Sequence, residues 1–173
     1  MKLLVLGSDS SILDANSPMA QRTREYGSMT DKYTVIVVNN QDKKIKLNDK
    51  IEVYGLCSRF KFLLFFKIYF FAGKIINSEK YDLISSPDAY YLGLISWFLA
   101  KRFSLPLQVQ VHGWEKNNLV RRLLAKYILK RANNIRVVSQ RLKKQLENDF
   151  KIDSNKIINI PIYVDISEKS PNT

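Results

Sequence analysis

Short β-rich runs alternate with helix-length segments along the whole chain. This alternation is typical of an α/β protein with a largely parallel sheet and helices on both faces. A length of 173 residues, of which 46% are hydrophobic, suits one domain with a substantial core. We therefore predict a single Rossmann-like domain. The expected strands are 2–8, 33–39, 50–56, 81–86, 107–113, 134–139 and 156–165, and the expected helices are 18–29, 58–79, 89–102, 117–132 and 140–148.

The segment 40–50, between the second and third expected strands, is polar, and we assign no strand to it. The single cysteine, Cys57, excludes an internal disulfide and a cysteine-based zinc site. The apolar stretch 1–6 is too short for a signal peptide, and three lysines interrupt the apolar segment 60–76, so neither crosses a bilayer. We therefore expect a cytoplasmic protein, peripheral to the inner membrane face at most.

The net charge of +12 is concentrated in one part of the chain. Residues 116–145 contain ten basic side chains and no acidic one. Such a patch favours an anionic membrane surface or a lipid-phosphate acceptor. Nucleic acid is an unlikely partner because the basic run lacks interleaved aromatic residues and no nucleic-acid-binding motif is present. The basic residues proposed for this contact are Arg121, Arg122, Lys126 and Lys130.

Aromatic residues crowd the expected helix 58–79, from Phe60 to Phe71. The three lysines of this segment predict a partly exposed crossover helix with a wide apolar face. The aromatic run itself suits either a membrane-facing stripe or a buried crossover helix. We favour the buried crossover helix. The expected helix 117–132 is amphipathic, with apolar residues at helical spacing and basic residues stepping by four along another face.

Functional residues of such sheets lie beyond the carboxyl ends of the strands. Several polar loops are expected there, namely 8–16, 85–88 and 112–115, together with Ser139 and Asp165. The loop after the strand 107–113 carries His112, which is the only histidine of the chain, followed directly by Gly113.

Four segments, in their order and spacing, resemble the amino-terminal half of a family 4 glycosyltransferase. They are 15–27, 81–113, 124–146 and 156–165. The resemblance implies a retaining, metal-independent enzyme with the two-domain glycosyltransferase-B fold. It implies that residues 1–165 form a Rossmann-like acceptor-binding domain and that 166–173 form a polar tail at the interdomain linker. The nucleotide-sugar would be a substrate rather than a cofactor, held mainly by a donor-binding domain or chain that this sequence lacks.

The resemblance also assigns roles to individual residues. The histidine of the His112–Gly113 pair would lie in the cleft and touch the transferring sugar. Asp88 falls on an acidic position of the family, and Ser139 and Arg141 fall on its S-x-R/K segment. Two departures are that Gly7 stands alone in the first loop and that a tryptophan precedes the glutamate after the His-Gly pair.

Each of these residues also has a structural interpretation. His112 could be a hydrogen-bonded structural histidine, although the strand-end position and Gly113 favour a functional one. Asp9 and Asp88 could orient an acceptor hydroxyl, together with Ser8 and Asn16, or could cap the following helices, and for Asp9 we favour the cap. Arg22 and Arg24 could reach a phosphate in the cleft or lie on a solvated helix face, and the two interpretations have equal weight.

The leading hypothesis is the acceptor-binding half of a retaining glycosyltransferase, which moves a sugar from a nucleotide-sugar to a glycan or lipid-linked acceptor hydroxyl in polysaccharide biosynthesis. Half a cleft should be inactive alone, since rate enhancement requires that donor and acceptor be held together. The alternative is a non-catalytic module that docks on an anionic membrane or a partner transferase. Glycoside hydrolysis is disfavoured because no suitably spaced pair of carboxylates is evident.

Overall fold

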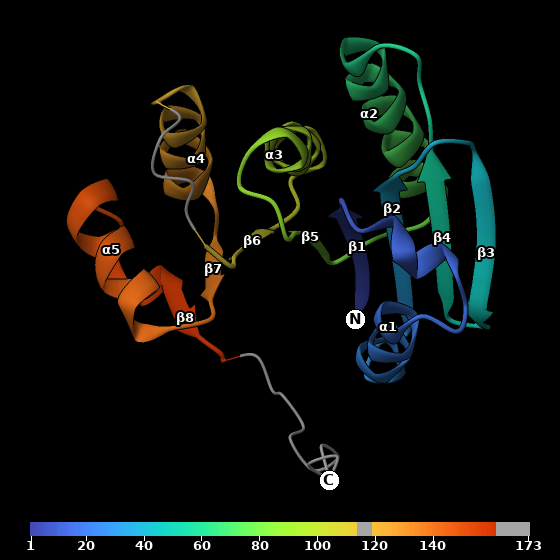
Figure 1. The fold of residues 1–173 in the computed structure, drawn as a ribbon, viewed down its shortest axis with the longest axis horizontal. Helices are drawn as coiled ribbons and strands as arrows, with labels where there is room; N and C mark the ends of the chain where they lie inside the picture. Colours follow the sequence, from blue (N-terminus) through green and yellow to red (C-terminus); the bar gives the residue numbers. More distant parts are fainter. Residues whose placement is uncertain (114–118, 162–173) are drawn as a thin grey trace, which may run out of the picture.

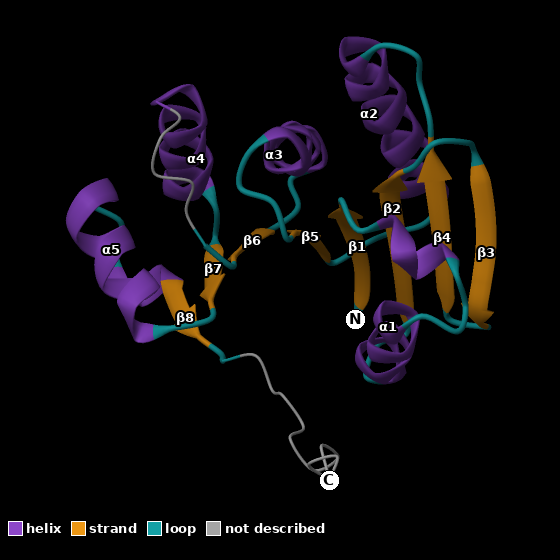
Figure 2. Cartoon of the chain, in the orientation of Figure 1, coloured by secondary structure: helices purple, strands orange, loops and turns teal. Residues whose placement is uncertain are grey.

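The computed structural model describes residues 1–113 and 119–161. Their elements alternate as the sequence predicts (Figures 1 and 2). The strands are β1 (Lys2–Gly7), β2 (Lys32–Val38), β3 (Lys43–Asn48), β4 (Ile51–Leu56), β5 (Leu83–Ser86), β6 (Leu107–Val111), β7 (Asn134–Val137) and β8 (Ile157–Asn159). The helices are α1 (Pro18–Ser28), α2 (Lys61–Ser78), α3 (Tyr91–Phe103), α4 (Leu119–Arg131) and α5 (Gln140–Phe150), with short 3₁₀ turns η1 (Ser10–Leu13) and η2 (Ser154–Lys156).

The described strands form one sheet in the order β3-β4-β2-β1-β5-β6-β7-β8. Every neighbouring pair is parallel except β3 and β4, which are antiparallel. The prediction of a single α/β domain with a largely parallel sheet is confirmed. The chain moves from β1 to β2 in one direction, whereas β4-α2-β5 and the later units move in the other. The order therefore reverses between β1 and β5.

The right-handed rule for parallel crossovers explains where the helices lie. Crossovers that run in opposite directions along a sheet place their helices on opposite faces. Accordingly, α1 and η1 cover one face over the small core cluster that includes Val35 and Val53. Helices α2 to α5 cover the other face, over the main core (Figure 1).

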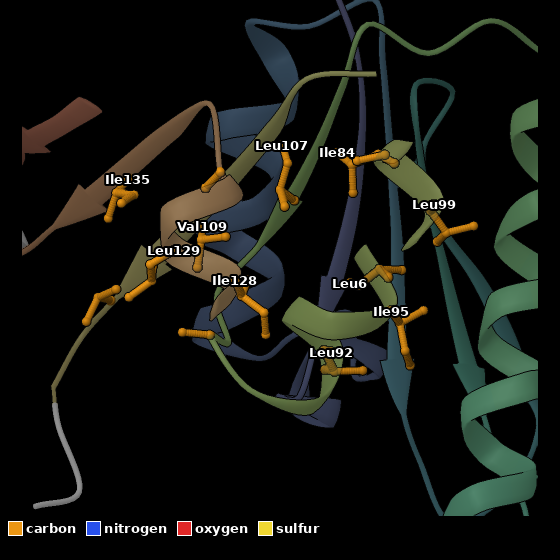
Figure 3. Packing of buried hydrophobic residues seen from close by; sticks show 14 of the residues in the cluster. Leu6, Ile84, Leu92, Ile95, Leu99, Leu107, Val109, Ile128, Leu129 and Ile135 are labelled. Carbon is orange, nitrogen blue, oxygen red and sulfur yellow. The ribbon is translucent and has the colours of Figure 1, made fainter. Parts of the chain in front are cut away.

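The main core lies between the sheet and the helices that cover it, and Figure 3 shows the part of it beneath α3 and α4. Leu6, Ile84 and Val109 point from neighbouring strands toward the helices, and Ile95 and Ile128 meet them from α3 and α4 (Figure 3). All five side chains are fully or almost fully buried. Each buried side chain of this size contributes about 1.5–3 kcal/mol of hydrophobic stabilisation. This packing fixes the loops at the carboxyl ends of β5 and β6.

The polar segment 40–50 contains an unexpected strand. Within β3, Ile45 and Leu47 are half-buried and pack against the small core cluster, whereas Lys44 and Lys46, which alternate with them, are exposed. Lys44 and Lys46 also lie within 3.0 and 3.8 Å of Glu52 on β4. Exposed lysines are typical of an edge strand because they discourage pairing with another chain. The lysines that suggested a loop therefore belong to the sheet edge.

Helix α2 is the partly exposed crossover helix predicted from its lysines, between β4 and β5, but its aromatic run is not buried as we favoured. Its core-facing side consists of Leu64, Ile68, Ala72, Gly73 and Ile76. Four phenylalanines of the same run face solvent, with exposed fractions of 51% to 63%. They are Phe60, Phe62, Phe66 and Phe70.

Helix α4 divides its apolar residues between the core and solvent. Ile128 and Leu129 are buried, whereas Leu119, Val120 and Leu123 are exposed. No helix among the described residues is both long and apolar enough to cross a membrane. The last strand is shorter than predicted, because β8 ends at Asn159 and residues 160 and 161 are not in a strand. Residues 114–118, the predicted strand residues 162–165 and the predicted tail 166–173 lie outside the described residues.

Candidate functional site

A pocket of about 200 Å³ opens at the carboxyl ends of β1, β5 and β6. It lies where the strand order reverses, and ligands of open α/β sheets bind at this kind of switch point. Four residues that the sequence singled out line it, namely Ser8, Asp88, His112 and Gly113. The other lining residues are Pro87, Ala89, Tyr90, Gln110 and Val111.

His112 directly follows β6, and strand alternation places it on the same side of the sheet as Gln110. The side chain remains accessible to solvent. Desolvation by the surrounding protein, and to a lesser degree the positive charge of Arg136, lower the pKa of His112 below its usual value of 6.5. The imidazole is therefore neutral at physiological pH. A neutral ring can donate one hydrogen bond to a sugar hydroxyl and accept another.

The titration of His112 can be measured without ambiguity, since the chain contains one histidine. We expect NMR of the imidazole to give a pKa below 6.5, and Arg136→Gln to raise it because one cause of the shift is removed. Since the folded pKa lies below the unfolded one, His112 stabilises the fold above the unfolded pKa, and this contribution is lost as the pH falls through the folded pKa. A wild-type pKa above 6.5, or no change in the variant, would contradict this account.

Asp88 lies at the amino terminus of α3, and both carboxylate oxygens are engaged there. Oδ1 accepts a hydrogen bond from the backbone N–H of Tyr90 at 2.7 Å, and Oδ2 accepts one from Leu92 at 2.9 Å. The carboxylate satisfies donors that the helix leaves unpaired and complements the helix dipole. Each oxygen keeps a further lone pair. The cap thus fixes Asp88 at the pocket without excluding contact with a hydroxyl.

Gln110, Tyr90 and Arg136 were not predicted as residues of the site. Gln110 Nε2 donates to Ser85 Oγ at 3.3 Å, and Ser85 Oγ donates in turn to Gln108 Oε1 at 3.2 Å. This relay orients the Gln110 amide. The signal for Gln110 was its position two residues before His112, on the same face of the strand. Arg136 lies opposite Gln110 in the register between β6 and β7, which the sequence does not reveal.

Gly113 leaves open space beside His112. A Cβ atom built at this position would meet no described atom within 4 Å. The glycine is therefore not required by close packing within the described residues.

The other predicted site residues do not line the pocket. Asp9 caps η1 by accepting a hydrogen bond from the backbone N–H of Ser11 at 3.0 Å. Ser139 caps α5 in the same way, through a bond of 3.3 Å from Leu142.

The remaining three candidates, Asn16, Arg141 and Arg24, also lie outside the pocket lining. Asn16 is exposed in the loop between η1 and α1, and Arg141 is exposed on α5. Arg24 is half-buried on α1, which covers the opposite face of the sheet from α2 to α5. Within residues 1–113 and 119–161, no group of three His, Cys, Asp or Glu side chains could hold a metal ion.

The model of glycosyltransferase family 4 matches residues 20–168 of the sequence, which span the pocket-forming strands β5 and β6 and both of their following loops. The chain belongs to glycosyltransferase family 4. The family expected from the four sequence segments is confirmed. None of the curated proteins with which the sequence was compared matches it.

Solved structures show which fold this family 4 chain shares. The UDP-GlcNAc 2-epimerase of Methanocaldococcus jannaschii is similar with a TM-score of 0.65 and 19% identity, over 92% of this chain and 45% of the epimerase. The lipopolysaccharide outer core galactosyltransferase WaaB gives 0.68 and 16%, over 96% and 47%. HepE of Anabaena, solved in complex with UDP, gives 0.65 and 17%, over 99% and 47%.

The family 4 chain spans about half the length of these solved structures. Identities this low establish the fold alone. The described domain is thus one half of a glycosyltransferase-B fold, in agreement with the predicted fold class.

Proposed function

We propose that this chain is the acceptor-binding half of a retaining glycosyltransferase. The observation that carries the proposal is the pocket at the switch point, which gathers Ser8, Asp88, Gln110 and His112 at the ends of three neighbouring strands or in the loops that follow them. Carboxylate, amide and imidazole groups are suited to binding sugar hydroxyls, since together they offer both donors and acceptors. Family membership supports the sugar as substrate.

In the completed reaction, an acceptor hydroxyl forms a new bond to the anomeric carbon of the donor sugar. The bond from that carbon to the nucleotide diphosphate breaks, and the hydroxyl proton leaves with the diphosphate oxygen. Asp88 would orient the acceptor hydroxyl through its remaining lone pairs. His112, being neutral, would contact the transferring sugar and help to stabilise the positive charge that develops at the anomeric carbon, which a protonated ring would oppose.

The size of the pocket supports a division of labour between two halves. Sites for drug-sized ligands usually measure roughly 300–1,000 Å³ and bury most of the ligand. The present pocket of about 200 Å³ is open and suits one sugar-sized group. We propose that the nucleotide part of the donor is bound by a second domain or chain, and that the bound halves together align the reacting atoms.

Calorimetric titration of the chain with UDP-glucose, UDP-galactose, UDP-GlcNAc and GDP-mannose tests this division. Without contacts for the nucleotide, we expect dissociation constants weaker than about 1 mM, which corresponds to about 4 kcal/mol of binding free energy. Micromolar binding of any of these donors by this chain alone would overturn the proposed division.

A further inference from the structure

The outward sides of α2, α3 and α4 form one continuous apolar surface, which we call the aromatic face. These helices are neighbours in the layer that covers the main core, in the order α2, α3, α4 (Figure 1). The exposed side chains of this face and their exposed fractions are Phe62 63%, Phe66 53%, Phe70 58%, Phe98 41%, Leu123 59% and Tyr127 39%.

Ring contacts connect the exposed residues of α2 to those of α4. Phe66 contacts Phe65, with centroids 5.6 Å apart, and Phe65 contacts Phe98 on α3 at 6.2 Å. Phe98 then contacts Trp97 at 4.7 Å, and Trp97 contacts Tyr127 on α4 at 5.2 Å. The aromatic residues thus form one patch across three helices. Single exposed apolar residues are ordinary, whereas a contiguous patch marks an interaction surface.

The charges on the three helices of the aromatic face have one sign, and one of them, Lys67, pairs with the Asp42 carboxylate at 2.5 Å. Helices α2, α3 and α4 carry ten basic residues and no acidic one. Several of these basic groups are held against the rings. The Arg131 guanidinium lies 3.6 Å from the centroid of Tyr127 and 5.8 Å from that of Trp97, over which Lys101 also lies at 5.7 Å. The basic residues are Lys61, Lys67, Lys74, Lys101, Arg102, Arg121, Arg122, Lys126, Lys130 and Arg131.

We propose that the aromatic face docks on the surface of an anionic membrane. A bilayer interface offers both complements at once, an apolar layer for the phenylalanines and anionic headgroups for the lysines and arginines. A second copy of this chain is a poorer partner, because a symmetric contact would bring two sets of ten positive charges together. No described helix can span a bilayer, so α2, α3 and α4 would lie on the membrane rather than cross it.

The aromatic face borders the pocket. The hydroxyl of Tyr91, at the start of α3, donates a hydrogen bond to the backbone carbonyl of Lys61, at the start of α2. The Arg121 guanidinium on α4 lies 5.6 Å from the ring of Tyr90, which lines the pocket. Docking would therefore place the pocket near the headgroup layer. The docking itself does not depend on the proposed function.

Vesicle cosedimentation of the full chain tests the proposal. Vesicles of phosphatidylcholine with 30% phosphatidylglycerol are compared with vesicles of phosphatidylcholine alone. We expect binding to the anionic vesicles to be at least about tenfold tighter, because each basic residue near such a surface adds about 1 kcal/mol. Equal binding to both compositions, or no binding to either, would overturn the proposal.

Two sets of variants separate the electrostatic contribution of the basic residues from the apolar contribution of the aromatic residues. Changing Arg121, Arg122, Lys126 and Lys130 to glutamine should weaken binding about 600-fold, from about fivefold for each of the four charges. The matched control changes four basic residues outside the three helices to glutamine, namely Arg22, Lys46, Lys50 and Lys80. It removes the same net charge and should weaken binding at most a few fold. An equal loss in both variants would mean a general charge effect and would overturn the proposed surface.

The aromatic side chains are tested at constant charge. Changing Phe62, Phe66 and Phe70 to serine should weaken binding about a hundredfold or more, since insertion of apolar area provides the second contribution. The matched control changes the exposed Tyr26, Met29 and Ile158 to serine and should bind as wild type. Thermal unfolding of each variant verifies the fold. A wild-type dimer that the serine variant dissociates, without vesicle binding by either, would assign the surface to self-association instead.

Discussion

Replacing Gly93 with alanine should destabilise the domain by about 2–3 kcal/mol, the cost of forcing an extra methyl group into a closely packed site. Gly93 is buried in the first turn of α3. A Cβ atom at this position would lie 2.4 Å from the backbone carbonyl oxygen of Asp88 and 3.6 Å from Ile128 Cδ1. A backbone atom cannot rotate away as a flexible side chain can. The loop that holds Asp88 at the pocket would have to move.

Gly73→Ala is a matched control, because Gly73 is also a buried glycine within a helix. A Cβ atom there would lie 3.7 and 3.8 Å from ring atoms of Phe103, which is ordinary contact. We expect this variant to gain about 0.5–1 kcal/mol from the restricted unfolded chain and the better helix propensity of alanine. Urea unfolding of both variants measures whether each substitution lowers or raises the free energy of unfolding. A Gly93→Ala variant as stable as wild type would contradict this prediction, because it would show that the loop around Asp88 can move at little cost in free energy.

The alternation of strands and helices was predictable because each element carries its own periodicity. The side of an element that faces solvent was harder to predict. In α2, both the core side and the solvent side are apolar, so the pattern does not reveal which residues are buried. In β3, half-buried Ile45 and Leu47 alternate with lysines that also resemble a loop. In both cases, which side chains are buried depends on neighbouring elements that are distant in the sequence.

The residues that line the pocket were predictable where a general rule applies and hidden where they depend on register. The rule that ligands bind beyond the carboxyl ends of strands selected Ser8, Asp88 and His112, and all three line one pocket. The same rule also selected Asp9 and Ser139. The Asp9 carboxylate caps η1 and the Ser139 hydroxyl caps α5 instead. Arg136 was missed because its effect on the His112 pKa arises from strand pairing, which single-sequence patterns do not contain.

Changing His112 to alanine should lower kcat about 10²–10³-fold under the proposed function, the usual effect of removing one group that stabilises charge in a transition state. The measurement is sugar transfer by the chain together with its donor-binding half, with the acceptor KM determined separately. A group that contacts the transferring sugar should change kcat more than the acceptor KM. His112→Gln should retain part of the activity, because an amide also donates and accepts hydrogen bonds.

The pH profile distinguishes this role from a purely structural one. Protonation would give His112 a positive charge that opposes the charge developing at the anomeric carbon, so activity should fall as the pH drops through the His112 pKa. That pKa lies below 6.5, and one cause is the charge of Arg136. Arg136→Gln should therefore move the acid limb of the profile to higher pH, and His112→Gln should abolish that limb. An unshifted acid limb in both variants, or full activity in His112→Ala, would remove His112 from the reaction and leave Asp88 and Gln110 as the groups that bind the sugar.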